Sequence, residues 1–186
     1  MAVQPLKVLI DHLREGPKTL PLDHRPEWFD LKDDAYAFVG AVTGAVTFAL
    51  VGRDVQGHGG LKVTVETPCV RCLAPVRLEL RVPVDEVWLW RSAEREVSPL
   101  DPAGVEDIVS YYEGEELDVA ETLRELIMAA LPDYPRCRAD CKGLCPGCGA
   151  NLNVETCRCR GAASPEAADV PEWKRALRRF GEHPAS

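Results

Sequence analysis

The eight cysteines of this 186-residue chain lie in four close pairs, and this spacing restricts the fold more than any other feature of the sequence. The pairs are Cys69/Cys72, Cys137/Cys141, Cys145/Cys148 and Cys157/Cys159. Each pair can bring two thiolates to one metal ion, and Zn²⁺ prefers four tetrahedral sulfur ligands. Sites in which the protein supplies all four ligands are structural rather than catalytic. The sequence therefore predicts two structural zinc ions.

The most distinctive local motif is the run of residues 145–149, Cys-Pro-Gly-Cys-Gly. Proline and glycine allow a tight turn between two sulfurs and leave backbone N–H groups free to face them. Cys69 and Cys72 have the same C-x-x-C spacing without the glycines. The spacings of the other two pairs are weaker evidence for metal binding, and they support it only in combination with the first two pairs.

Two other uses of cysteine compete with metal binding. A disulfide framework is typical of short secreted chains in an oxidising compartment, but the first apolar run, residues 6–10, contains Lys7 and does not have the pattern of a secretory signal. Thioredoxin-like chemistry would place Cys69 at a helix N-terminus, whereas strand-like residues surround this pair. We therefore expect reduced, metal-binding cysteines in a cytoplasmic protein.

The net charge of −8 originates in one segment. Residues 94–125 contain eleven acidic and two basic side chains, which leaves the remainder of the chain at +1. Net negative charge argues against nucleic-acid binding, because phosphate contacts dominate such affinities, but the uneven distribution weakens this objection. We interpret residues 94–117 as a solvated acidic loop. No segment approaches the roughly 20 apolar residues that a membrane span requires.

Periodicity predicts an α+β fold. From about residue 35 to residue 90, hydrophobic side chains recur with period two, which indicates four or five antiparallel strands, and residues 57–60 (Gly-His-Gly-Gly) are interpreted as a turn. The clearest helix is predicted over residues 118–131, with Asp118 as N-cap and Glu121 completing a capping box. Its apolar stripe suits packing against the antiparallel sheet.

The predicted organisation has four parts. They are an N-terminal segment, 1–34, with a short helix over 5–15; the sheet and helix, 35–133, including the acidic loop 94–117; a zinc-binding segment, 134–161; and a linker with a C-terminal amphipathic helix, 162–186. The third part has too few apolar residues to fold by burial, so metal binding would supply its folding free energy.

The sequence shows no catalytic motif. It lacks G-x-G-x-x-G, P-loop and G-x-S-x-G patterns, and a filled four-cysteine zinc site has no position for an activating water. We therefore expect a non-enzyme without a small-molecule substrate.

Basic side chains gather near the cysteines, and two interpretations remain open. They could offset the negative charge of Zn²⁺ bound by four thiolates, or they could form an arginine-rich surface that binds RNA. The residues are Arg71, Arg136, Arg138, Lys142, Arg158 and Arg160.

Together these motifs resemble the YceD family of bacterial large ribosomal RNA subunit accumulation proteins, which has plastid relatives. The resemblance covers about residues 35–160. Cys69, Arg71, Cys72 and Leu73 match the first motif; Cys137, Cys141, Lys142, Gly143, Leu144, Cys145, Pro146, Cys148, Gly149, Asn151, Leu152, Asn153, Cys157 and Cys159 match the second.

The resemblance implies how the cysteines pair and what the protein does. Cys69/Cys72 would join Cys137/Cys141 in site 1, and Cys145/Cys148 would join Cys157/Cys159 in site 2. The implied function is a cytoplasmic ribosome biogenesis factor that supports accumulation or processing of large-subunit ribosomal RNA and contacts this RNA or a ribosomal precursor. An alternative is an adaptor whose acidic loop 94–117 binds a basic ribosomal protein or assembly factor. A redox sensor that releases zinc on oxidation is a third hypothesis.

Overall fold

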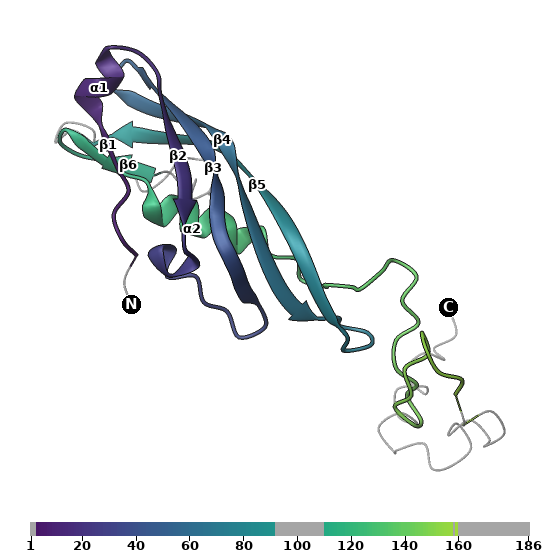
Figure 1. The fold of residues 1–186 in the computed structure, drawn as a ribbon. Coiled ribbons are helices and arrows are strands. Elements are labelled where there is room, and N and C mark those ends of the chain that lie inside the picture. The colour runs from purple at the N-terminus through teal and green to yellow at the C-terminus, as the bar shows by residue number, and fades with distance from the viewer. Residues whose placement is uncertain (1–2, 92–109, 158, 160–186) are drawn as a thin grey trace, which may run out of the picture. The chain divides into compact units, whose positions relative to one another are not determined.

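A five-stranded sheet forms the centre of the fold (Figure 1). Its strands lie in the order β2-β3-β4-β5-β6. They are β2 (Lys18–His24), β3 (Ala37–Val51), β4 (Asp54–Pro68), β5 (Pro75–Trp90) and β6 (Ser110–Tyr112). Neighbours from β2 to β5 are antiparallel, whereas β6 runs parallel to β5. The sheet is therefore mainly antiparallel, as the alternation of side chains predicted, with one parallel pair at its edge.

The computed structural model describes residues 3–91, 110–157 and 159, in two units, Met1–Ala139 and Asp140–Ser186. The first unit contains the five-stranded sheet. It also contains a small sheet of β1 (Lys7–Leu9) and β7 (Glu116–Asp118), and the helices α1 (Ile10–Arg14), η1 (Pro26–Phe29, a 3₁₀ helix) and α2 (Ala120–Ala129). Among the helices described, none has the length and apolar character needed to cross a membrane.

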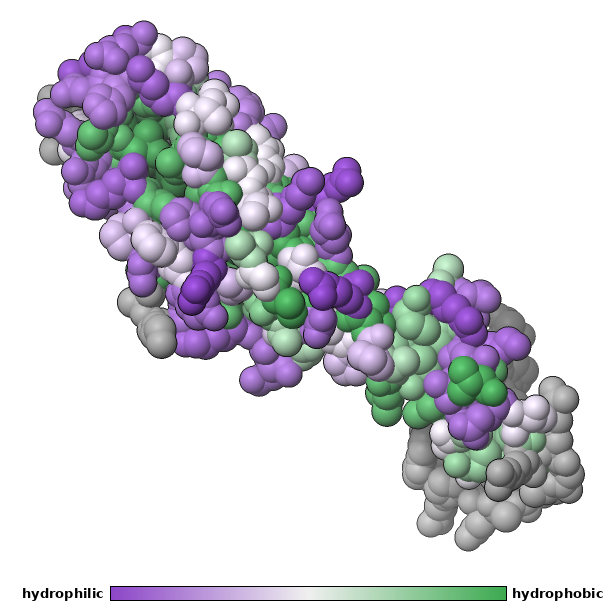
Figure 2. Space-filling view, viewed as in Figure 1, coloured by the Kyte–Doolittle hydropathy of each residue, from purple (hydrophilic) through white to green (hydrophobic). Residues whose placement is uncertain are grey.

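Helix α2 lies across one face of the sheet, as Figure 1 shows, and buries its apolar side. Leu123 and Ile127 of α2 are fully buried in one cluster with Phe48 and Trp88 of the sheet. The indole Nε1 of Trp88 donates a hydrogen bond to Thr122 Oγ1 at 3.2 Å, so its polar atom is satisfied inside the core. Burial of these large side chains is the main source of stability in the first unit. In the view of Figure 2, hydrophilic residues cover most of this unit's surface, with hydrophobic residues visible between them.

The predicted helix 118–131 is present as the shorter α2. Asp118 accepts from the N–H of Ala120 as a capping side chain would, but it is not the N-cap residue, and Glu121 pairs with Arg124 instead of completing a capping box. Val119 is the N-cap and makes no side-chain cap hydrogen bond. Asp118 is instead the last residue of β7, where its Oδ1 accepts from the N–H groups of Leu6 and Ala120, both at 3.0 Å. The Glu121 carboxylate accepts from Arg124 at 3.2 Å. Pairing of β7 with β1 therefore decides where the helix begins.

Short strands occur where the sequence predicted helix or loop. Residues 5–15 form β1 followed by the one-turn helix α1, and β2 within the predicted N-terminal segment 1–34 forms an edge of the main sheet. The predicted acidic loop 94–117 contains β6 and the start of β7. Most of that loop, 94–109, and the predicted C-terminal helix lie outside the described residues.

The predicted turn at residues 57–60 is also wrong, because these glycines lie inside β4. The β3–β4 connection comes earlier, where Gly52 has φ +67°. Inside the sheet the glycines allow close contact: a Cβ added to Gly59 would lie 2.2 Å from the carbonyl oxygen of Ala45, and one added to Gly57 would lie 2.7 Å from the Trp88 ring. A glycine-rich run can mark either a turn or a close approach of strands, and here it marks the second.

Gly59→Ala is expected to lower the free energy of unfolding by about 1–3 kcal/mol, because the added Cβ meets backbone that cannot move without breaking the ladder. The neighbouring Gly60→Ala is the matched control, since its Cβ would lie at an ordinary 3.5 Å from the nearest atom, the carbonyl oxygen of Val82. We expect Gly60→Ala to change stability by less than about 1 kcal/mol. Urea unfolding of both variants measures the difference, and equal midpoints would show that strand proximity does not select glycine here.

Candidate metal centres

The first group of cysteines is built on the turn that joins β4 to β5. Pro68 and Pro75 pair at the end of the ladder, so residues 69–74 make the connection. The N–H of Cys69 donates to the carbonyl of Ala74 at 2.8 Å, and the N–H of Leu73 donates to the carbonyl of Cys69 at 2.9 Å. These two bonds close a tight turn in which Cys69 and Cys72 are both buried.

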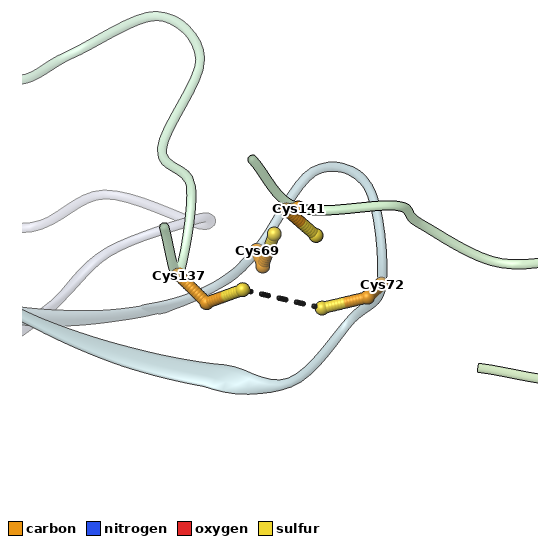
Figure 3. Close-up of side chains that lie close together, drawn as sticks. All are labelled: Cys69, Cys72, Cys137 and Cys141. Carbon is orange, nitrogen blue, oxygen red and sulfur yellow. Dashed lines mark hydrogen bonds between the residues drawn. The ribbon is translucent and has the colours of Figure 1, made fainter. Parts of the chain in front are cut away.

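The segment after α2 brings further cysteines to this turn. The N–H of Val70 donates to the carbonyl of Pro135 at 3.0 Å, and the Sγ atoms of Cys72 and Cys137 lie 3.6 Å apart. Figure 3 shows the side chains of Cys69, Cys72, Cys137 and Cys141 converging. Their four sulfur atoms all lie within 4.8 Å of one another and could hold a metal ion. The structure thus brings together the four residues that the family resemblance assigned to site 1.

The second group contains Cys145, Cys148, Cys157 and Cys159, whose sulfur atoms also lie within 4.8 Å of one another. The Sγ of Cys157 lies 3.2 Å from that of Cys145 and 3.9 Å from that of Cys148. Gly149 has φ +73°, a conformation that favours glycine, and its N–H donates to the carbonyl of Cys145 at 2.8 Å. All eight cysteines are free of disulfide bonds, so both groups offer four thiols.

Asn153 is a supporting residue to which the sequence gave no role beyond its place in a motif. Its Nδ2 donates to the Sγ of Cys141 at 3.4 Å and to Oδ1 of Asn151 at 2.9 Å. Its Oδ1 accepts from the N–H of Lys142 at 2.8 Å. An amide donor beside a sulfur stabilises the thiolate form that a metal requires. The Asn-x-Asn spacing shortly after the cysteines was the available signal, but only the fold shows which atom it contacts.

The thiols within each group change one another's pKa. A backbone N–H of Cys137 facing the sulfur lowers the pKa of Cys69 to about 6. In the second group the hydrogen bond from Cys157 lowers the pKa of Cys145 to about 6 and raises the pKa of Cys157. Contact with Cys148, and then with Cys157, raises the pKa of Cys159 to about 12. The second group without a cation therefore contains both thiolate and thiol, because adjacent thiolates repel.

The structure describes four of the six basic residues that the sequence predicted near the cysteines. Arg71 and Arg136 lie near each other in the first unit, since they follow the two residues joined by the Val70–Pro135 hydrogen bond. Arg138 is also exposed in this unit, and Lys142 is exposed in the second. Arg158 and Arg160 lie outside the described residues.

Metal binding to the second group should release protons. At pH 7 the raised pKa values keep Cys157 and Cys159 protonated, whereas only thiolates bind metal. We expect at least two protons released per ion, so affinity should rise with pH, roughly 100-fold per unit around neutrality. Zinc titration calorimetry of the Cys69→Ser/Cys137→Ser chain, in buffers of different ionisation enthalpy, counts the protons. Release of fewer than two protons per ion would be inconsistent with this arrangement of thiols.

Comparison with known proteins gives the family. The family model described as large ribosomal RNA subunit accumulation protein YceD matches residues 57–176, a range that includes all eight cysteines. Uncharacterized proteins of Mycobacterium tuberculosis and Mycobacterium bovis are 31% identical over 126 residues, which cover 68% of this chain and 51% of theirs. An uncharacterized protein of Mycobacterium leprae is 30% identical over 105 residues, covering 56% of this chain and 46% of its own.

The chain spans about half the length of the curated relatives it matches. No solved structure matches it. The family model, however, covers well over half of the chain, with the cysteine-bearing segments inside the match. The protein therefore belongs to the YceD family of large ribosomal RNA subunit accumulation proteins.

Proposed function

We propose that the protein is a non-catalytic zinc protein of the cytoplasm that binds ribosomal RNA or a ribosomal precursor and thereby supports accumulation of large-subunit ribosomal RNA. The description of the family, large ribosomal RNA subunit accumulation protein, supports a role connected with the large subunit. The observation that carries the proposal is the exposed pair Arg71 and Arg136 beside a four-cysteine group, with Arg71 on the β4–β5 turn and Arg136 on the segment hydrogen-bonded to that turn. RNA-binding surfaces combine such charge with a fixed scaffold.

The donor sets suit zinc. A tetrahedral ion with Zn–S distances of about 2.3 Å places its sulfurs about 3.8 Å apart. The separations of 3.6 Å between Cys72 and Cys137 and 3.9 Å between Cys148 and Cys157 are close to this value. Cys145 and Cys157, at 3.2 Å, are closer than a regular tetrahedron requires. Four sulfurs fill all positions on each ion and leave none for a water, so we assign both ions a structural role.

The arginines are available to a partner. Arg71 and Arg136 are exposed, and within residues 3–91, 110–157 and 159 neither forms an ion pair. If they served only to offset the negative charge of the metal and its thiolates, their removal would change metal affinity. If they bind RNA, their removal should leave the zinc content unchanged and weaken binding.

The alternative function is an adaptor that binds a basic protein through the acidic segment. Its sequence basis is the net charge of −9 between residues 94 and 125. Three of its described acids already lie beside basic side chains of the chain: Glu116 pairs with Lys7, Glu113 lies 3.7 Å from Arg91, and Glu121 lies 3.2 Å from Arg124. The remaining acids offer less charge to a partner than the sequence count suggests, so we favour RNA.

Crosslinking in living cells tests the proposed function. Ultraviolet crosslinking, purification of the protein and sequencing of the bound RNA should recover large-subunit ribosomal RNA or its precursor, because direct contact is required for crosslinking at zero length. The Arg71→Gln/Arg136→Gln variant should crosslink less at equal zinc content. Arg81→Gln is the control, an exposed arginine on β5 whose loss changes charge by the same amount per site.

Two results together would favour the adaptor. The crosslinked protein would yield no ribosomal RNA, and it would capture a basic ribosomal protein that is lost when the acidic residues of segment 94–117 are neutralised. Equal crosslinking by the wild-type and arginine-substituted chains would show that Arg71 and Arg136 do not contribute to RNA binding.

A further inference from the structure

Three large hydrophobic side chains next to the first group of cysteines are exposed. Val70 is 49% exposed, Leu73 64% and Tyr134 75%, whereas the cysteines beside Val70 and Leu73 are buried. In the β4–β5 turn Val70 follows Cys69 and Leu73 follows Cys72, and Tyr134 lies three residues before Cys137. Exposed apolar side chains are common singly, but their concentration around one rigid turn points to a contact surface.

Neither the backbone conformation of Leu73 nor its packing against the described residues favours leucine at this position. Its φ is +59°, in the left-handed region that disfavours a side chain, and glycine would adopt this conformation without strain. Its side chain is largely in water, so core packing does not explain it either. An unfavourable backbone conformation combined with an exposed apolar side chain is a reason to look for function at that residue.

Tyr134 and Arg136 lie on the segment that is hydrogen-bonded to this turn. The hydrogen bond from Val70 N–H to the Pro135 carbonyl, 3.0 Å long, places the residues that flank Pro135, Tyr134 and Arg136, beside Val70 and Arg71. The knuckle surface, defined as Val70, Arg71, Leu73, Tyr134 and Arg136, therefore contains one exposed aromatic ring, two aliphatic side chains and two guanidinium groups, all within the first unit.

We propose that the knuckle surface binds a single-stranded segment of RNA, with the Tyr134 ring stacked on an unpaired base and Arg71 and Arg136 on the flanking phosphates. This inference rests on the proposed function and adds the form of the RNA and the residues that contact it. Aromatic rings stack on bases whose faces are free, which the bases of a duplex are not. A protein partner fits less well, because these few side chains are far fewer than the 20 to 30 residues per side of a typical stable protein interface.

The hydrogen-bonded backbone of the β4–β5 turn also favours RNA binding by the knuckle surface. The backbone of residues 69–74 is held by its own hydrogen bonds and by the bond to Pro135. Side chains carried on a fixed backbone lose less entropy on binding than side chains on a mobile loop. Val70 and Leu73 can then contact the sugar or base edges next to the stacked ring.

Fluorescence anisotropy of the full-length, zinc-loaded chain with a labelled single-stranded RNA of about 12 nucleotides tests the proposal, that length matching common single-strand binding sites. Tyr134→Ala should weaken binding by about 5- to 150-fold, the range measured for loss of one base–aromatic stack. Tyr134→Phe should bind within about twofold of the wild type, because the π-face remains. Tyr134→Leu should resemble Tyr134→Ala, which separates stacking from burial of apolar surface.

Salt dependence separates the roles of the residues. Tyr134→Ala should leave the slope of log affinity against log salt unchanged, whereas Arg71→Gln and Arg136→Gln should each reduce it by about 0.7. Arg81→Gln, about 20 Å away along β5 from the turn, should change neither affinity nor slope.

Leu73→Gly should bind more weakly although its unfolding midpoint is equal or higher, since glycine relieves the left-handed backbone. Annealing the RNA to its complement should abolish the effect of Tyr134→Ala.

The outcomes distinguish this proposal from the function it extends. If Tyr134→Ala binds as tightly as the wild type while the arginine variants bind more weakly, stacking is wrong and the RNA-binding function stands. If the wild-type chain binds neither single-stranded nor duplex RNA, the RNA-binding function itself fails. If the wild type binds no RNA but Tyr134→Ala no longer co-sediments with ribosomal precursors, the knuckle surface binds a protein and the proposal is overturned.

Discussion

The clustering of Cys69, Cys72, Cys137 and Cys141 is the constraint on which the β4–β5 turn and the residues exposed on it depend, because it joins segments far apart in the chain. Between Cys72 and Cys137 lie 64 residues, which include β5, β6, β7 and α2. An ion that closes so long a loop removes many conformations from the unfolded chain. The hydrophobic core formed by α2 and the sheet stabilises the same arrangement, so a metal bound at these cysteines would favour the topology that core packing already favours.

The same closure determines what the protein presents to solvent. Burial of Cys69 and Cys72 turns the residues between and after them outward, so that Val70, Arg71 and Leu73 are exposed on a short, hydrogen-bonded turn. The bond to Pro135 adds Tyr134 and Arg136 to this surface. A structural metal can thus contribute to recognition without touching the ligand, by fixing the backbone that carries the contacting side chains.

Part of the fold and of the cysteine groups could be predicted from the sequence, and part could not. Metal chemistry predicts two groups of four cysteines, because it fixes the number and type of ligands. Which pairs share a group was implied only by the resemblance to the YceD family. The strands β3 and β5 follow from alternation, whereas β1, β6 and β7 are three-residue strands whose existence depends on distant partners. Gly57 and Gly59 were misinterpreted as a turn because only the fold shows which backbone lies against them. The exposure of Tyr134 and the left-handed backbone of Leu73 were also not predicted, because neither residue carries a local sequence signal such as a glycine at the left-handed position.

X-ray absorption at the zinc K-edge tests the central claim most directly, because it reports the atoms bound to the metal in the intact chain. The account predicts two zinc ions per chain, each with four sulfur neighbours at about 2.3 Å and no nitrogen or oxygen neighbour. Nitrogen or oxygen scatterers near 2.0 Å, or a single ion per chain with four of the eight cysteines still reactive toward a thiol reagent, would contradict it.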